Sequence, residues 1–198
     1  MEKDNIQDWL VKTGRKMVQD NGPEALTVRK LAEASGCSVG MIYNQFANME
    51  NFILIQNFLT LDDLEKNFRK IEKTGNPYQD INVFLQTFVD FVISNKNLWS
   101  MLHNFHLNNN SRTFSFFYLR KVVQIVGNVG EMVRRIVPDM EIPERLLSAQ
   151  ILWLTLFSLS SFLAKDTLDS FSKVNKKMIC QVLLNTYIAG LTVLENKK

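Results

Sequence analysis

The stretch TVRKLAEASGCSVGMIYNQF, residues 27–46, contains the pattern of a helix-turn-helix. Ala32, Gly36 and Ile42 stand at the spacing that this motif requires. Ala32 is small enough for the point where two short helices cross, Gly36 tolerates positive φ in the turn, and Ile42 can fill the wedge between the helices. The second helix is then expected to present its outer face to a DNA major groove.

Capping residues predict where the helices around this turn begin. Thr27 and Ser38 can cap the two helices of the motif, and Asn48 can cap the helix that follows. A further helix precedes the motif, because apolar residues recur on one face from Ile6 onward. It ends at Asn21-Gly22-Pro23, where glycine suits a C-terminal cap and proline prevents continuation.

The helix that begins after Asn48 is expected to be a long connector. It runs for about 25 residues, or ~38 Å, to Thr74-Gly75-Asn76-Pro77, where glycine suits a C-cap, asparagine an N-cap and proline the first helical position. Later helices are expected at 77–95, 97–106, 113–136, from Pro143 onward, and at 175–195. No segment alternates like a strand, so the sequence predicts an all-α fold of about nine helices.

One apolar segment allows two interpretations. Leu146–Ala164 contains no charged residue and is flanked by Arg145 and Lys165, so it is long enough to span a membrane. Its serine, threonine and glutamine residues lower its hydropathy, and we favour a helix buried on nearly all sides in the protein or at a dimer interface.

The charge distribution limits how the motif could bind DNA. The chain has a net charge of +3, but residues 1–50 carry six Lys/Arg and seven Asp/Glu. DNA contacts would therefore depend on a few well-placed cations and not on a broad basic surface. The separate Cys37 and Cys180 are typical of reduced cytoplasmic thiols, and the charged N-terminus does not look like a secretory signal.

The run LTVRKLAEASGCSVGMIYNQFANMENF, residues 26–52, resembles the DNA-binding domain of the TetR family of transcriptional regulators. The matching residues are Gly22, Leu26, Thr27, Val28, Leu31, Ala32, Ala34, Gly36, Ser38, Gly40, Tyr43, Phe46, Glu50 and Phe52. The resemblance implies a three-helix DNA-binding domain at 1–47, joined by the long helix to a helical effector-binding and dimerisation domain at 48–198.

The resemblance also implies which residues meet DNA: Thr27, Val28, Arg29, Lys30, Ser38, Val39, Gly40, Met41, Tyr43, Asn44 and Gln45. Their chemistry fits this role. Thr27 and Ser38 begin helices whose free N–H groups can meet phosphates. Tyr43 can donate its hydroxyl to a phosphate, Asn44 can read adenine, and Met41 can contact a thymine methyl group.

Two residues depart from the family pattern. The family usually has a phosphate-binding lysine where this chain has Met49, so we expect weaker non-specific binding and a salt dependence lower by about one charge. Cys37 replaces a small aliphatic residue in the turn, and we expect it to pack as a small hydrophobe.

The family places a ligand cavity in the second domain, where this chain is rich in aromatic residues. The candidate ligand-binding residues are Trp99, His103, His106, Phe117, Gln150, Trp153 and Phe157. Such cavities are mostly apolar, so we expect a small, uncharged or weakly polar, hydrophobic or aromatic effector. His103 and His106 have no acidic or Cys partner nearby, so neither a metal site nor a cofactor is expected, and no catalytic grouping suggests an enzyme.

Together these features predict a cytoplasmic, ligand-responsive repressor. We expect a homodimer, paired through the last two helices, that binds a palindromic operator in double-stranded DNA and is released by the effector. The alternative is a helical hydrophobic-ligand binding protein with weak or lost DNA binding, for which Met49 and the acidic N-terminal balance speak.

Overall fold

The computed structural model describes residues 3–108, 116–164 and 176–195, and all regular structure in these ranges is helical. The described helices are α1 (Lys3–Asn21), the 3-10 helix η1 (Pro23–Ala25), α2 (Val28–Ser35), α3 (Val39–Phe46), α4 (Met49–Arg69), α5 (Pro77–Ser94), α6 (Lys96–Asn108), α7 (Phe116–Ile136), α8 (Ile142–Ala164) and α9 (Lys176–Glu195). The prediction of an all-α fold with nine α-helices is confirmed within the described ranges.

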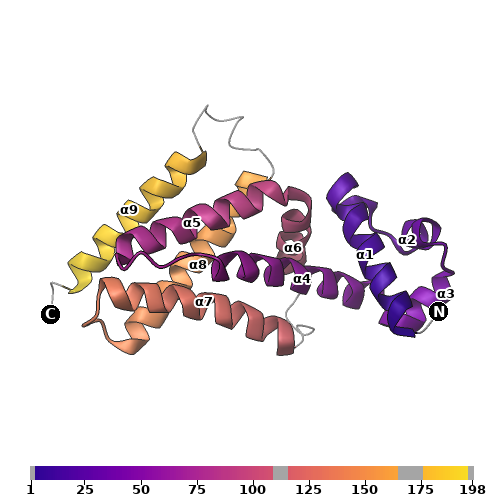
Figure 1. Cartoon of the computed structure of the whole chain (residues 1–198), viewed down its shortest axis with the longest axis horizontal. Helices are drawn as coiled ribbons and strands as arrows, with labels where there is room; N and C mark the ends of the chain where they lie inside the picture. Colours follow the sequence, from indigo (N-terminus) through magenta and orange to yellow (C-terminus); the bar gives the residue numbers. More distant parts are fainter. Residues whose placement is uncertain (1–2, 109–115, 165–175, 196–198) are drawn as a thin grey trace.

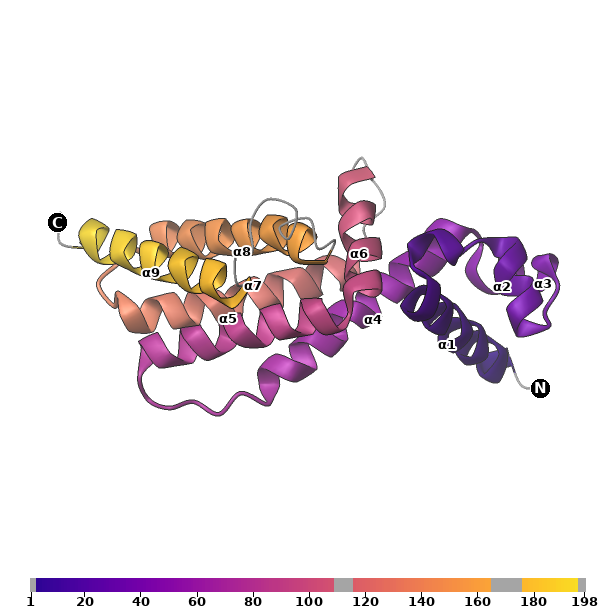
Figure 2. The same cartoon turned by 90° about the horizontal axis from the view of Figure 1, so that it is seen from above.

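The molecule is elongated, with two groups of helices connected by α4 and α6 (Figures 1 and 2). We call α1–α3 the N-terminal unit and α5, α7, α8 and α9 the C-terminal unit. Helix α4 leaves the N-terminal unit and runs along the C-terminal one, whereas α6 stands across the junction (Figure 2). A displacement of α4 or α6 can therefore reach both units.

The four predicted helix caps are all formed. The side chains of Thr27 and Ser38 accept hydrogen bonds from backbone N–H groups in the first turns of α2 and α3. Asn48 accepts the N–H of Asn51 at 2.7 Å, and Asn76 accepts two N–H groups at the start of α5. These caps satisfy amides that a helix cannot bond internally, so they define the helix starts.

The predicted end of the long connector was wrong. Helix α4 ends at Arg69, and Gly75, with a φ of 87°, lies in the loop before α5 and does not cap α4. Asp80 explains the loop: its carboxylate accepts the backbone N–H and the hydroxyl of Thr74, each at 2.7 Å, and a guanidinium N–H of Arg135 at 2.6 Å. These interactions hold the segment before α5 in a non-helical path.

Two apolar clusters form the interior. One fills the C-terminal unit and includes aromatic residues such as Phe84, Phe88 and Trp99. The other fills the N-terminal unit around Leu10. It also contains Phe52 of α4 and two residues of α6, Leu98 and Met101. The interior of the N-terminal unit is thus completed by helices that belong to the rest of the chain.

Within a single chain helix α8 is only partly buried, and its predicted burial at a dimer interface stays a prediction. Ala149, Leu152 and Leu156 point into the core, which makes α8 a core helix of the C-terminal unit. Its composition and length are nevertheless those of a membrane-spanning helix, and only 33% of its most apolar window is buried. Its outer face carries the exposed residues Ile142, Leu146, Leu147, Ile151, Leu154 and Phe162.

Candidate DNA-binding surface and ligand region

The turn between α2 and α3 has the geometry that the sequence pattern predicts. Gly36 adopts the left-handed conformation with a φ of 70° and ends α2. The N–H of Cys37 bonds to the carbonyl of Ala32 at 3.2 Å, which closes the turn. Ile42 is 1% exposed between the two helices, and Ala32 and Cys37 pack against the same cluster. The inner side of the motif therefore holds α3 in a fixed orientation.

The opposite side of α3 is open to solvent. Val39, Met41 and Tyr43 are 37–42% exposed despite their apolar bodies, and Ser38, Gly40 and Asn44 are exposed as well. At the start of α2, Thr27, Arg29 and Lys30 are exposed. The structure thus gathers most of the predicted DNA-binding residues on one accessible surface.

Two of the predicted contacts are less accessible. Val28 is half-buried and packs against the interior of the N-terminal unit, and Gln45 is half-buried. Met49 packs against the same interior at the start of α4. Apolar packing therefore takes the place of a phosphate-binding cation at Met49, as the departure from the family pattern suggests.

Gly40 has no internal reason to lack a side chain. Its φ is not positive, and a Cβ built on it would meet only the Ser38 hydroxyl, at 4.0 Å. Gly14 of α1 is the opposite case, because a Cβ there would lie 2.6 Å from the Phe52 ring. Gly14 is required by packing, whereas any requirement for glycine at position 40 must come from outside the chain.

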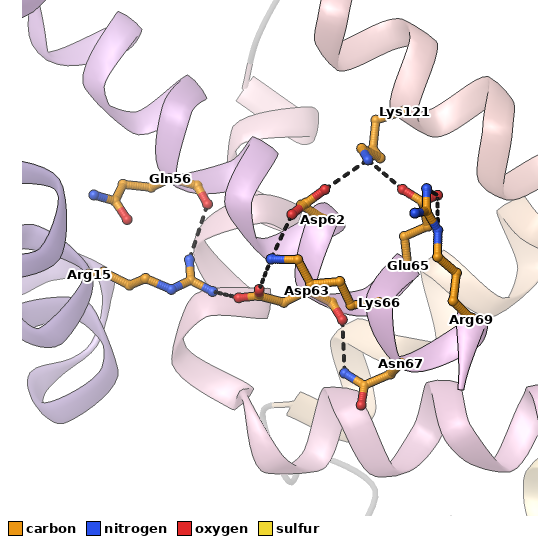
Figure 3. A network of polar contacts seen from close by, with 9 residues as sticks. All are labelled: Arg15, Gln56, Asp62, Asp63, Glu65, Lys66, Asn67, Arg69 and Lys121. Carbon is orange, nitrogen blue, oxygen red and sulfur yellow. Dashed lines mark hydrogen bonds and ion pairs between the residues drawn. The ribbon is translucent and has the colours of Figure 1, made fainter. Parts of the chain in front are cut away.

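An ion-pair network joins α1 to α4 (Figure 3). The Arg15 guanidinium contacts the Asp63 carboxylate at 2.6 Å and donates to the Thr60 hydroxyl at 3.2 Å and to the Gln56 carbonyl at 3.4 Å. Burial lowers the pKa of Arg15, and Asp63 counteracts this effect. Lys66 extends the network along α4, since it also contacts Asp63, at 3.4 Å.

The same stretch of α4 is held from the other side by α7 (Figure 3). The Lys121 ammonium contacts Asp62 at 2.9 Å and also contacts Glu65, which in turn accepts a hydrogen bond from Arg69. Burial alone would raise the pKa of Glu65, but the hydrogen bonds from Lys121 and Arg69 lower it. Lys121 also lies 5.5 Å from the centre of the Phe58 ring, a favourable cation–π distance. The acidic segment of α4, formed by Asp62, Asp63 and Glu65, thus connects the N-terminal unit with α7.

Four of the predicted ligand-binding residues lie together. His103 stacks on Phe157 with ring centres 5.0 Å apart, and Trp99 and Trp153 lie 5.9 and 6.2 Å from the same ring. The Trp99 indole donates to the Ser160 hydroxyl at 2.6 Å. Trp99 and Trp153 are also part of the C-terminal core.

Of the other three predicted ligand-binding residues, only the side chain of Gln150 is described. Gln150 is exposed on α8, beside the outward-facing Ile151, and is not part of the aromatic group. The side chains of His106 and Phe117 lie outside the described residues.

Asn57 is a candidate functional residue that the sequence analysis did not identify. Its side chain is fully buried in α4, and both amide atoms have no hydrogen-bond partner among the residues that the structure describes. The available signal was an amide in an otherwise apolar stripe, because Leu54, Leu61 and Leu64 share its side of the helix.

A cavity of about 450 Å³ lies between the N-terminal unit and α6, and it too was not predicted. Its lining comes from η1, the residue after it, α4 and α6: Pro23, Glu24, Leu26, Glu50, Ile53, Met101, Asn104 and Phe105. None of the five predicted ligand-binding residues whose side chains the structure describes is among them.

Comparisons with known proteins agree with this geometry. Residues 10–54 match the family described as bacterial regulatory proteins, tetR family. No curated protein matches the chain in sequence. Several solved structures share the fold of nearly the whole chain. A tetR-family transcriptional regulator from Streptomyces coelicolor has a TM-score of 0.71 at 16% identity, covering 98% of this chain and 83% of that one.

Two further structures were solved with ligands. FadR from Bacillus subtilis, in complex with stearoyl-CoA, has a TM-score of 0.66 at 12% identity, with 92% of this chain and 98% of that chain covered. BioQ with its double-stranded DNA operator has a TM-score of 0.67 at 14% identity, with 93% and 96% covered. At such low sequence identities, these TM-scores show a common fold and not a common function. The helix-turn-helix region of this chain, residues 10–54, thus matches the tetR family of bacterial regulatory proteins, and nearly the whole chain shares the fold of solved TetR-family regulators.

Proposed function

We propose that the protein is a dimeric, ligand-responsive repressor that binds a palindromic operator and is released by a small hydrophobic effector. The observation that carries this proposal is the two-sided α3: Ile42 and Phe46 fix its inner side in the core, while polar and apolar side chains remain exposed on its outer side. We retain residues 1–47 as the DNA-binding domain and 48–198 as the effector-binding and dimerisation domain.

The exposed residues divide into two kinds of DNA contact. Arg29, Lys30 and the helix N-termini capped by Thr27 and Ser38 suit phosphates. Val39, Gly40, Met41, Asn44 and Gln45, which lie further along α3, suit base edges, and Tyr43 suits a neighbouring phosphate. Val28 supports the surface from behind, because it packs on the interior.

The outer faces of α8 and α9 support the homodimer. Leu147, Ile151 and Leu154 recur on one exposed side of α8 with helical spacing. Met178 and Val182 do the same on α9, where they are 63% and 56% exposed. Apolar side chains exposed in such number along two helices favour a partner that covers them. Two copies paired there would place two recognition helices for a two-fold symmetric operator.

The effector is proposed to act through α4. FadR binds stearoyl-CoA in a similar fold, and the aromatic group around Phe157 would suit an apolar ligand here as well. A ligand that favours another position of α4 would shift the population of dimers away from the spacing that fits both half-sites. The acidic segment held by Arg15 and Lys121 provides the mechanical connection.

Selection of binding sites from random DNA, followed by fluorescence anisotropy, tests the function. We expect a palindromic site and a loss of affinity in Arg29→Ala and Tyr43→Ala. Tyr78→Ala is the matched control, because Tyr78 is 45% exposed, close to the 42% of Tyr43, but belongs to α5, a helix that lies away from α3 (Figure 1). If the wild-type dimer enriches no sequence, the alternative of a hydrophobic-ligand binding protein without DNA binding is favoured, as Met49 already suggests.

A further inference from the structure

The side-chain amide of Asn57 is buried and has no hydrogen-bond partner among the residues that the structure describes. Burying an amide without hydrogen bonds is unfavourable, and native proteins rarely keep such groups without a function. Asn57 is a buried residue of α4, whereas the proposed DNA contacts belong to α2 and α3 and the proposed dimer contacts to α8 and α9. Neither DNA binding nor dimerisation therefore accounts for it.

Asn57 stands at the level where α4 leaves the N-terminal unit. The neighbouring Gln56 donates its side-chain N–H to the Val11 carbonyl of α1 at 2.8 Å. One helical turn before Asn57, Ile53 lines the cavity of about 450 Å³ between the N-terminal unit and α6. Residues four apart lie on neighbouring positions of a helix surface, so Asn57 follows Ile53, which forms this wall of the cavity, by one turn on the same side of α4.

The residues that line the cavity favour an apolar ligand without a negative charge. Leu26, Ile53, Met101 and Phe105 make it largely apolar, and its volume is in the range of small-molecule sites. Met101, a flexible side chain, can move to let a ligand reach inward. Two acidic residues, Glu24 and Glu50, also line the cavity, and their negative charges disfavour an anionic ligand.

We propose that this cavity, extended to Asn57, is a ligand site separate from the aromatic group around Phe157. It binds a small apolar molecule with one neutral group that both donates and accepts hydrogen bonds, such as a carboxamide. The ligand occupies the space between η1, α4 and α6, so its binding changes how the N-terminal unit sits on α6. This effect on DNA rests on the proposed function, whereas the binding itself does not.

The first experiment measures the stability of variants without ligand. Asn57→Leu keeps the branched shape but removes the amide, and we expect its melting temperature to rise by about 2–4 °C. Asn57→Ala serves as a second variant if leucine is too large. The matched control is Asn67→Leu in the same helix, where the amide donates to the Asp63 carbonyl at 2.8 Å and its loss should lower the melting temperature. A fall for both Asn57 variants would overturn the proposal, because it would show a buried water or another internal partner.

The second experiment uses three probes with the same apolar body: 4-phenylbutanamide, methyl 4-phenylbutanoate and butylbenzene. We expect the amide to raise the wild-type melting temperature most and the hydrocarbon least, and we expect Asn57→Leu to abolish this order. Ile53→Trp, which fills the cavity, should abolish stabilisation by all three. The same order in Asn57→Leu, or no stabilisation of the wild type, would overturn the proposal.

Operator release by the same probes is measured separately by anisotropy. Probe binding without operator release would contradict the regulatory role and leave the ligand site intact. Failure of the wild type to bind any DNA would contradict the proposed function and not the site.

Discussion

Arg15 of α1 and Asp63 of α4 form an ion pair at 2.6 Å that joins the N-terminal unit to the long helix α4. The Arg15 side chain is 16% exposed and Asp63 is 41% exposed, so solvent screens part of the interaction. Arg15 also donates to Thr60 and to the Gln56 carbonyl, and these bonds depend on the same position of α1.

Replacing Arg15 by Met should loosen α1 from α4. We expect a loss of about 1–2 kcal/mol in the free energy of unfolding, because one partly screened ion pair and two hydrogen bonds are removed. Urea unfolding measures this loss, and operator affinity should fall with it. Lys66→Met is the control, since Lys66 is 60% exposed and its loss should leave the unfolding midpoint unchanged. Equal effects of the two variants would contradict a special role for Arg15.

Acid should weaken the anchor of α4 to α7. Hydrogen bonds lower the folded pKa values of Asp62 and Glu65 below their ordinary values of 3.8 and 4.5. A carboxyl group with a depressed folded pKa contributes stability above its unfolded pKa, and this contribution is lost as the pH falls through the folded value. We therefore expect the melting temperature to fall below about pH 4.5.

Glu65→Gln tests which carboxylate is responsible. Glu65 is 1% exposed and contacts Lys121, so the variant should be less stable at pH 7 and should show a shallower decrease in acid. Glu131→Gln is the control, because Glu131 has a lowered pKa from Arg134 but is exposed. An unchanged acid dependence in Glu65→Gln would exclude Glu65 as a main contributor.

Gly40→Ala should separate stability from DNA binding. Alanine is the better helix former, so the variant should gain about 0.5–1 kcal/mol in unfolding free energy. Its methyl group points where DNA is proposed to approach, and we expect roughly tenfold weaker operator binding, equivalent to about 1.4 kcal/mol. Gly127→Ala in α7 is the matched control, since a Cβ there meets nothing within 4 Å and a Cβ at Gly40 meets only the Ser38 hydroxyl, at 4.0 Å. It should gain stability and bind the operator normally.

Leu154→Lys should dissociate the dimer. Leu154 is 63% exposed in a single chain and lies at the centre of the apolar face of α8, where a buried charge without a partner is unfavourable. Sedimentation should show a monomer, and operator affinity should fall with it. Val123→Lys in α7, where the side chain is 69% exposed, should leave the dimer intact. A dimeric Leu154→Lys protein would place the interface elsewhere.

The sequence predicted the features of the fold that depend on local chemistry. Thr27, Ser38, Asn48 and Asn76 cap the expected helices, and Gly36 forms the expected turn, because a short side chain or a missing Cβ acts on nearby backbone. The predicted end of α4 was wrong because the path of the following loop depends on Asp80. Asp80 binds Thr74 nearby and Arg135 far along the chain, and local sequence does not reveal the second contact.

The candidate sites show the same limit. The exposed face of α3 could be read from helical spacing, since Ile42 and Phe46 had to point inward. The aromatic residues indicated a core or a ligand site without separating the two. Gln150 is exposed on α8, and no local pattern in the sequence showed which side of this apolar helix faces the core. The cavity beside Ile53 arises where three elements meet, so only their packing reveals it.

The presence of Leu98 and Met101 in the interior of the N-terminal unit has a consequence for how such regulators can be recombined. Residues 1–47, cut out alone, would expose a hydrophobic surface that α4 and α6 normally cover. In a chimera that joins another DNA-binding domain to this chain, that domain must therefore pack against α6 as well as fit the junction at α4. New DNA specificity is more readily introduced by exchanging the outer residues of α3 than by exchanging the domain.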